Sequence, residues 1–79
     1  MVSAMVLLNT QIGAEKGVLE KLKTLEGVEE AHTLYSVYDI ALKVHANSMN
    51  QLKDIITQNI KRTPNVITTL TLLTVDDEQ

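Results

Sequence analysis

The order in which two kinds of apolar periodicity follow one another constrains this fold more than any other feature. Four segments have the continuous or alternating apolar pattern of strands, and two have the three-to-four-residue spacing of amphipathic helices. The predicted elements are a strand at 2–8, a helix at 15–25, strands at 28–35 and 40–46, a helix from 48 to the residue before Pro64, and a strand at 66–75. Strand, helix, strand therefore occurs twice, which predicts an α+β fold built from two βαβ halves.

Local signals mark the ends of both helices. Gly27 supplies a left-handed stop after the first helix, and Ser48 with Gln51 three residues later forms a capping box that opens the second. Pro64 ends that second helix because proline cannot continue it. The segments 25–28 and 63–66 thus play the same part in the two halves, as a joint between an amphipathic helix and a strand.

Right-handed crossovers between the halves give a ferredoxin-like sandwich, in which a four-stranded antiparallel sheet carries both helices on one face. The first and last strands along the chain, however, are apolar on both faces. The first strand alternates Val2, Ala4, Val6 and Leu8 with Met5 and Leu7, and the last alternates Val66, Leu70 and Leu72 with Ile67, Leu73 and Val75. Since the helices cover only one face, we expect a second copy to cover the other in a sheet-to-sheet dimer.

Composition narrows the function classes. With 79 residues the chain is expected to be one domain, residues 1–79, that ends in an acidic tail at 76–79 and has no helix-turn-helix. The absence of cysteine removes disulfides and thiolate metal sites, and no cofactor or metal is expected. A net charge of −3 with scattered basic residues argues against direct nucleic-acid binding, and no segment is long and apolar enough to span a membrane. We expect a cytoplasmic protein.

Both aromatic residues lie in one short segment, residues 34–40, between the two central strand patterns. The simplest connection there is an antiparallel hairpin that turns at residues 36–39. Asp39 beside this turn either braces the backbone or faces a cation such as an amino group. The residues alone favour the bracing role slightly.

At this point the chain resembles a known family, the effector-binding and oligomerisation (RAM) domain of the Lrp/AsnC feast/famine regulators, in a form that stands alone without the DNA-binding domain. The resemblance covers nearly the whole chain and resides in four motifs: Val6-Leu7-Leu8-Asn9-Thr10, Gly27-Val28-Glu29-Glu30-Ala31, Tyr35-Ser36-Val37-Tyr38-Asp39-Ile40 and Val66-Ile67-Thr68-Thr69-Leu70-Thr71-Leu72. It implies dimers that assemble into rings of dimers, with small molecules, typically amino acids, held at the contacts between dimers. No catalysis is implied.

The same resemblance implies a ligand site made of Ser36, Tyr38, Asp39, Thr69 and Thr71. In it Asp39 would accept the ammonium of an amino acid, and Thr69, Thr71 and turn N–H groups would donate to its carboxylate. Tyr38 would close the pocket over the ligand side chain. Ser36 departs from the family glycine, and its Cβ predicts an altered turn or a narrower pocket.

Other polar residues have plainer interpretations. We assign no function to His32 or His45, and the charges of Glu15, Lys16, Glu20, Lys21 and Lys23 fit the solvated side of the first helix. Thr69 and Thr71 are also good strand formers, and tyrosines are often packing residues.

Three function classes stay open at this stage: an amino-acid-sensing regulatory module, a structural partner that co-assembles with full-length Lrp/AsnC regulators, and a small enzyme of the dimeric α+β barrel kind. The third finds little support, because the sequence offers no recognisable acid–base pair.

Overall fold

A computed structural model describes residues 1–74 and confirms the predicted order of elements. The elements are β1 (Val2–Thr10), α1 (Glu15–Lys23), β2 (Val28–Thr33), β3 (Ile40–Ala46), α2 (Met49–Asp54), its continuation η1 (Ile55–Ile60) and β4 (Val66–Thr74). The predicted Val75 and the acidic residues 76–79 lie outside the described residues. Within the described part, no helix is long and apolar enough to cross a membrane.

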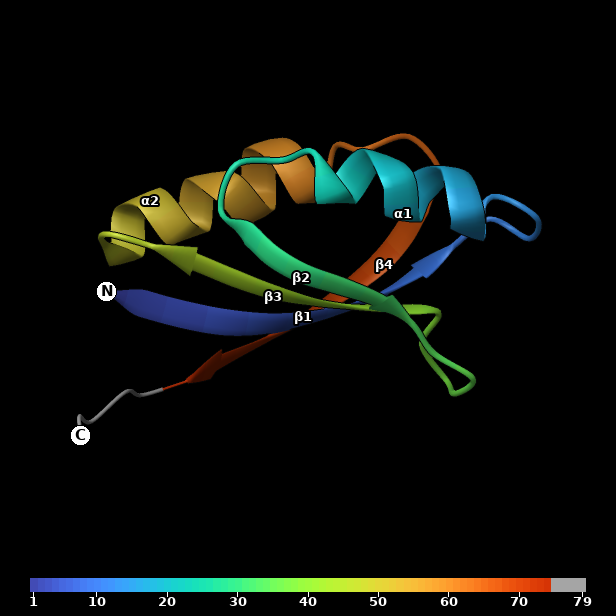
Figure 1. The fold of residues 1–79 in the computed structure, drawn as a ribbon, viewed down its shortest axis with the longest axis horizontal. Coiled ribbons are helices and arrows are strands. Elements are labelled where there is room, and N and C mark those ends of the chain that lie inside the picture. Colours follow the sequence, from blue (N-terminus) through green and yellow to red (C-terminus); the bar gives the residue numbers. More distant parts are fainter. Residues whose placement is uncertain (75–79) are drawn as a thin grey trace.

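The four strands form one antiparallel sheet in the order β2-β3-β1-β4, and the helices lie together on one side of it (Figure 1). The ferredoxin-like βαββαβ fold is therefore confirmed. The hairpin between β2 and β3 and the connection from β1 to α1 lie at the same end of the molecule (Figure 1). That shared end is where the candidate site is found.

The core lies between the helices and the sheet. Alternate residues of β1 and β3 face the helices, and their register pairs Val6 with Leu42 and Leu8 with Ile40. These four side chains are completely buried. From the helices the core receives Val18, Leu22, Leu52, Ile55, Ile56 and Ile60. Both helices thus bury one apolar side, as expected of amphipathic helices.

The two joints have the same backbone conformation. Gly27 has a φ of 91° and Asn65 a φ of 72°, and each directly precedes a strand. Positive φ suits glycine and, to a lesser extent, asparagine. The parallel drawn from sequence between segments 25–28 and 63–66 therefore reflects one shared turn geometry.

The second helix begins as predicted and then widens. The Ser48 hydroxyl accepts a hydrogen bond from the Gln51 N–H at 3.1 Å, and the Gln51 side chain accepts from the Asn47 N–H at 2.8 Å. From Ile55 to Ile60 the backbone is π-helical, and the Lys61 N–H accordingly bonds to the carbonyl of Ile56. Three isoleucines in this segment, Ile55, Ile56 and Ile60, are buried.

The face assignment predicted for the last strand was partly wrong. The register between β1 and β4 shifts at Asn9 and Thr10, so that Asn9 pairs with Thr68 whereas Thr10 pairs with Val66. Ile67 is the extra residue on β4, and because of it the residues before and after do not follow one alternation between the two faces of the sheet. Val66 therefore packs against the core, while Leu70, which was expected on the same face, pairs with Leu7 on the other side.

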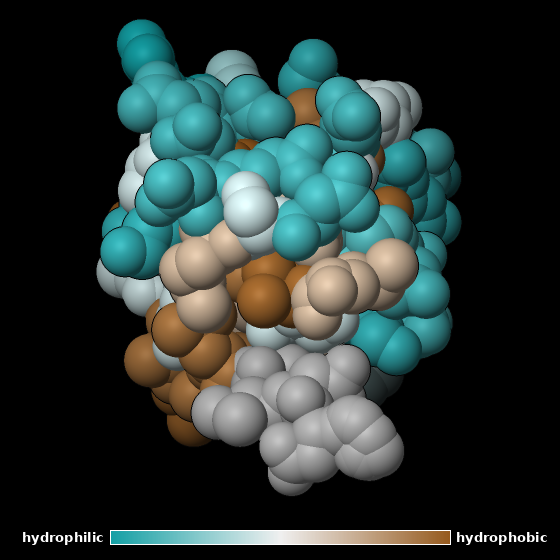
Figure 2. Space-filling model, turned by 90° about the vertical axis from the view of Figure 1, so that its left-hand side faces the viewer, coloured by the Kyte–Doolittle hydropathy of each residue, from teal (hydrophilic) through white to brown (hydrophobic). Residues whose placement is uncertain are grey.

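The sheet side that faces away from the helices is called here the open face. Its apolar residues on β1 and β4 are Met5, Leu7, Leu70 and Leu72, joined by Ala41 of β3. Leu70 and Leu72 are 41% and 48% exposed. Figure 2 shows mostly hydrophilic residues over the helical side and a hydrophobic patch below it. The sheet-to-sheet dimer stays a prediction, and this face is its basis.

Candidate functional site: the hairpin pocket

Asp39 fixes the end of the β2–β3 hairpin to the end of β1. Its carboxylate oxygen Oδ2 accepts a hydrogen bond from the Thr10 N–H at 2.9 Å, and its own N–H donates to the Leu8 carbonyl at 2.9 Å. Its carbonyl accepts from the Leu34 N–H at 2.8 Å, which closes the hairpin. Asp39 is thus the turn brace that the residues alone favoured. Its other carboxylate oxygen makes no hydrogen bond within residues 1–74.

The half-buried Asp39 also lines a cavity of about 340 Å³, which we call the hairpin pocket. Its lining residues are Glu15, Thr33, Leu34, Tyr35 and Asp39. A volume of this size is at the lower end of the range for small-molecule sites. Bracing the turn and lining a pocket are therefore compatible roles for one carboxylate, because each can use a different oxygen.

Glu15 is the site residue that sequence reasoning missed, since it was assigned to the solvated side of the first helix. It is half-buried in the first turn of α1, and its Oε2 accepts from the Gly13 N–H at 3.4 Å. The predicted topology could have indicated Glu15, because an antiparallel β1–β3 pair brings the end of β1 and the start of β3 to the same end of the sheet. The helix that follows β1 therefore starts beside the hairpin.

Ser36 lies in the loop of the hairpin and is exposed. Among the described residues, Asn65 is the only non-glycine with positive φ. Ser36 therefore adopts a backbone conformation that any residue tolerates. Within this chain the turn is built without the freedom of glycine, which explains how serine is accommodated there.

The two tyrosines differ in their placement in the single chain. Tyr35 lines the hairpin pocket and is fully exposed, whereas Tyr38 is half-buried and does not line the pocket. Val37 between them is 81% exposed. The tip of the hairpin thus presents apolar surface that nothing within the described chain covers.

Thr69 and Thr71 lie on β4, on the side of the sheet that faces the helices, where they pair with Leu8 and Val6. The whole of β1 separates them from the hairpin, a distance of about 10 Å across two strand spacings. Thr71 instead lines a groove beside α2 and η1. One chain therefore does not bring Thr69 and Thr71 to Asp39, and their role as ligand contacts stays a prediction about another copy.

The histidines lie on the open side of β2 and β3, each next to a glutamate. His32 Nε2 is 3.1 Å from a Glu30 oxygen, and His45 Nδ1 is 3.5 Å from a Glu29 oxygen that also lies 3.8 Å from Lys43 Nζ. No group of three or more ligating side chains in residues 1–74 is arranged to hold a metal ion. We interpret these histidine–glutamate pairs as contacts between neighbouring side chains of the sheet.

The hairpin pocket has an acidic lining. Two carboxylates, Glu15 and Asp39, line it together with the apolar parts of Leu34 and Tyr35, and no basic side chain does. Such a pocket attracts an ammonium and repels a carboxylate. Fold and pocket together define the class: a small α+β domain equipped to bind a small molecule.

Comparison with known families agrees with that class. The model of the Lrp/AsnC ligand binding domain matches residues 3–77, and the chain belongs to this family. The family resemblance of the sequence is thereby confirmed. No curated protein sequence matches the chain.

Solved structures include close relatives of the same size. The crystal structure of FFRP-DM1 shares 35% identity over 95% of this chain and 100% of that one, with a TM-score of 0.91. A hypothetical protein from Pyrococcus horikoshii, PHS023, shares 34% identity over 98% of this chain and 93% of that one, also with a TM-score of 0.91. The transcriptional regulator NMB0573 of Neisseria meningitidis, solved as a complex with L-Met, has 11% identity and a TM-score of 0.85. This chain covers 99% of its own length and 52% of that regulator, and at such identity the likeness shows the fold alone.

Proposed function

We propose that this chain is an amino-acid-sensing and oligomerisation module that acts in transcriptional or metabolic regulation, with the effector bound in the hairpin pocket. The observation that carries the proposal is the Asp39 carboxylate. One of its oxygens is anchored to the Thr10 N–H at 2.9 Å, while the residue also lines a pocket of ligand size. A carboxylate held in this way is preorganised to receive an ammonium, because little freedom is lost on binding. That the NMB0573 regulator was solved with L-Met supports an amino acid as the effector class.

The pocket of a single chain is half of a site. An amino acid carries a carboxylate as well as an ammonium, and the two acids of the hairpin pocket, Glu15 and Asp39, repel it. Donors for that carboxylate must come from elsewhere. Tyr35 and Val37, exposed at the hairpin tip beside the pocket, form an apolar surface on which another copy can pack. We therefore place the bound amino acid at a contact between dimers.

The dimer itself is proposed to form through the open face. Leu7 and Leu70 form a cross-strand pair at its centre, and Met5 pairs with Leu72 next to them. A second identical sheet is the natural cover for this patch, because homo-oligomers with two-fold symmetry bury the same surface on both copies. Full-length regulators of the family that display a similar sheet are candidates for the same contact.

We do not propose catalysis. The described residues contribute no nucleophile paired with a base to the hairpin pocket, and its two carboxylates are each engaged with a backbone N–H. The family, too, is one of ligand binding domains.

A thermal-shift screen of the twenty amino acids tests the proposal. A ligand at 100 times its dissociation constant adds about 2.7 kcal/mol to the free energy of unfolding, which is easily measured. We expect at least one amino acid to stabilise the protein. If none does, amino-acid sensing is refuted, and retrieval of a larger regulator in a pull-down would then favour co-assembly as the function.

Asp39 variants identify the site. Asp39→Asn keeps an oxygen that can accept from the Thr10 N–H but removes the charge, so we expect a folded protein that loses the amino-acid response. Asp39→Ala also loses the brace, and we expect it to be less stable without ligand by about 1–3 kcal/mol. Asp54→Asn, a change of equal charge on α2, is the matched control and should respond like the wild type. An unchanged dissociation constant for Asp39→Asn in calorimetry would remove Asp39 from the site.

A further inference from the structure

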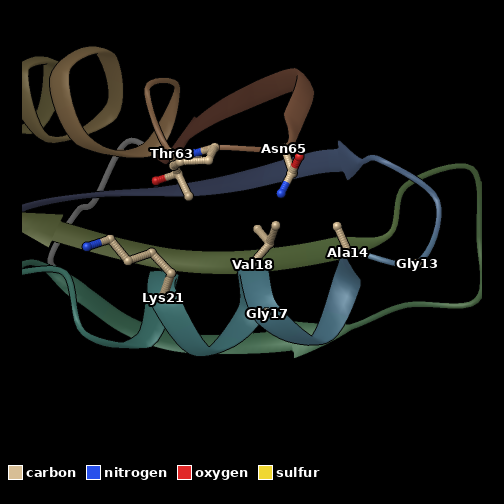
Figure 3. A pocket seen from close by; sticks show the side chains of 8 residues that line it. Gly13, Ala14, Gly17, Val18, Lys21, Thr63 and Asn65 are labelled. Carbon is tan, nitrogen blue, oxygen red and sulfur yellow. The ribbon is translucent and has the colours of Figure 1, made fainter.

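A second hollow lies on the other side of α1, and neither the predicted site nor the proposed function uses it. It measures about 430 Å³ and separates α1 from the turn that leads into β4. Figure 3 shows Ala14, Val18 and Lys21 rising from α1 toward Thr63 and Asn65, which form the opposite wall. We call it the α1 hollow; Gly13, Gly17 and Pro64 complete its lining. Its volume lies within the range of small-molecule sites.

Gly17 lines this hollow, and the packing of the fold gives no reason for a glycine there. Gly17 lies inside α1, where glycine costs about 1 kcal/mol relative to alanine. A Cβ built at Gly17 meets no atom within 4 Å, and its φ is not positive. The helix therefore accepts a weak helix former at the wall of a cavity, where a side chain would take up space that a ligand can use.

The charge of the α1 hollow is opposite to that of the hairpin pocket. Lys21 is the only charged residue that lines it, and its ammonium makes no ion pair within residues 1–74. Asn65 is held in place by its carbonyl, which accepts from the Gln11 N–H at 2.9 Å, while its side-chain amide has no partner in the described part of the chain. Figure 3 shows that amide directed toward α1. The ammonium is thus the group in the hollow that attracts an anion, and the amide is a separate polar group at its other end.

The remaining lining decides which anion fits. Ala14, Val18 and Pro64 are apolar, and a single lysine balances a single negative charge. A phosphate dianion would bring a second charge and no apolar part to meet these residues. From this combination we propose that the α1 hollow binds a small organic monocarboxylate, with its carboxylate on Lys21 and its short hydrocarbon part on Ala14 and Val18.

The test follows backbone amide NMR signals of the whole chain during titration with 3-methylbutanoate, with the neutral 3-methylbutanamide and inorganic phosphate as comparison probes. We expect saturable shifts at Gly13, Gly17 and Asn65 with the carboxylate, and much weaker binding of both comparison probes. Absence of saturable shifts with the carboxylate, or phosphate binding as tightly as the carboxylate, would overturn the proposal.

Three variants make the assignment specific. Lys21→Met removes the ammonium and keeps an apolar stem, and we expect binding to weaken about tenfold or more, as for loss of a charged hydrogen bond. Gly17→Leu fills the hollow with a good helix former and should abolish binding in a protein that stays folded. Lys23→Met removes an equal charge from a lysine that pairs with Glu20 outside the hollow, and it should bind like the wild type. Equal weakening by Lys21→Met and Lys23→Met, or full binding by Gly17→Leu, would show that the hollow is not the site.

This site is independent of the hairpin pocket. Asp39→Asn should leave 3-methylbutanoate binding unchanged, and Lys21→Met should leave the amino-acid response unchanged. Loss of carboxylate binding in Asp39→Asn would mean that one pocket accounts for both ligands, and the proposal would fall.

Discussion

At the scale of single residues, Asp39 has a structural role through one carboxylate oxygen, and the recognition role proposed for it uses the other. Oδ2 holds the Thr10 N–H at 2.9 Å, so the side chain is fixed before any ligand arrives. Because the same residue lines the hairpin pocket, its position there is inherited from the fold. Substitutions at Asp39 therefore need to separate charge from hydrogen bonding, which is why asparagine is more informative than alanine.

Substitution by alanine is expected to have opposite effects on stability at Gly27 and at Gly17. Gly27 has a φ of 91°, and a Cβ there would lie 2.6 Å from Ile55 Cδ1 and 3.0 Å from the His45 carbonyl oxygen. Gly27→Ala should therefore lower the free energy of unfolding by about 2–4 kcal/mol, because the backbone oxygen cannot move aside. Gly17→Ala should raise it by about 0.5–1 kcal/mol, since nothing obstructs the new methyl group. Urea denaturation measures both free energies of unfolding. If both variants were stabilised, or both destabilised, the roles given to the two glycines would be wrong.

At the scale of elements, the second helix depends on its first turn. Ser48 caps the Gln51 N–H, and Gln51 returns a bond to the Asn47 N–H, so α2 starts at a defined residue. The helix then passes into the π-helical η1, which carries three buried isoleucines onto the sheet. The residue at which α2 starts thus determines which side of the helix carries Ile55, Ile56 and Ile60 into the core.

Ser48→Ala removes that cap and should cost about 1 kcal/mol of unfolding free energy. For a domain of this size the midpoint of thermal unfolding should fall by about 4–8 °C. Circular dichroism during heating measures the shift. Ser48→Asp restores an acceptor at the same place and should recover most of the loss; equal destabilisation by both substitutions would show that the cap is not responsible.

At the scale of the whole molecule, the open face is the main unsatisfied feature. The helices lie on one side of the sheet only (Figure 1), and the apolar residues of β1 and β4 named above lie on the other side. A domain of 79 residues buries a modest share of its surface by itself, so the proposed dimer would add to its stability by covering this face.

Leu70→Lys tests the proposed dimer. Leu70 is 41% exposed and pairs with Leu7 at the centre of the open face. A lysine there would bury two like charges across a two-fold interface, so we expect the mass from light scattering to fall to that of a monomer. Gln58→Lys adds the same charge on the helical side and should keep the wild-type mass. A stable wild-type monomer at micromolar concentration would refute the dimer outright.

The sequence alone determined the order of the elements, the faces of β1, the joints at Gly27 and Asn65 and the cap at Ser48. Each of these depends on residues close together in the chain, where periodicity and backbone preference act directly. α1 and β2 each end two residues before the predicted end. The last turn of a helix and the last residues of a strand carry weak local signals, so their exact ends are hard to predict.

Only the tertiary structure decided which polar residues share a pocket. Glu15 and Asp39 are far apart in sequence and meet because antiparallel pairing brings the end of β1 to the start of β3. The irregularity at Ile67 places Val66 and Leu70 on opposite faces of the sheet. No local pattern predicts this, since valine, isoleucine and leucine fit either face. Sequence periodicity fixes which face a residue shares with its near neighbours, whereas a register shift or a pocket depends on contacts between distant segments.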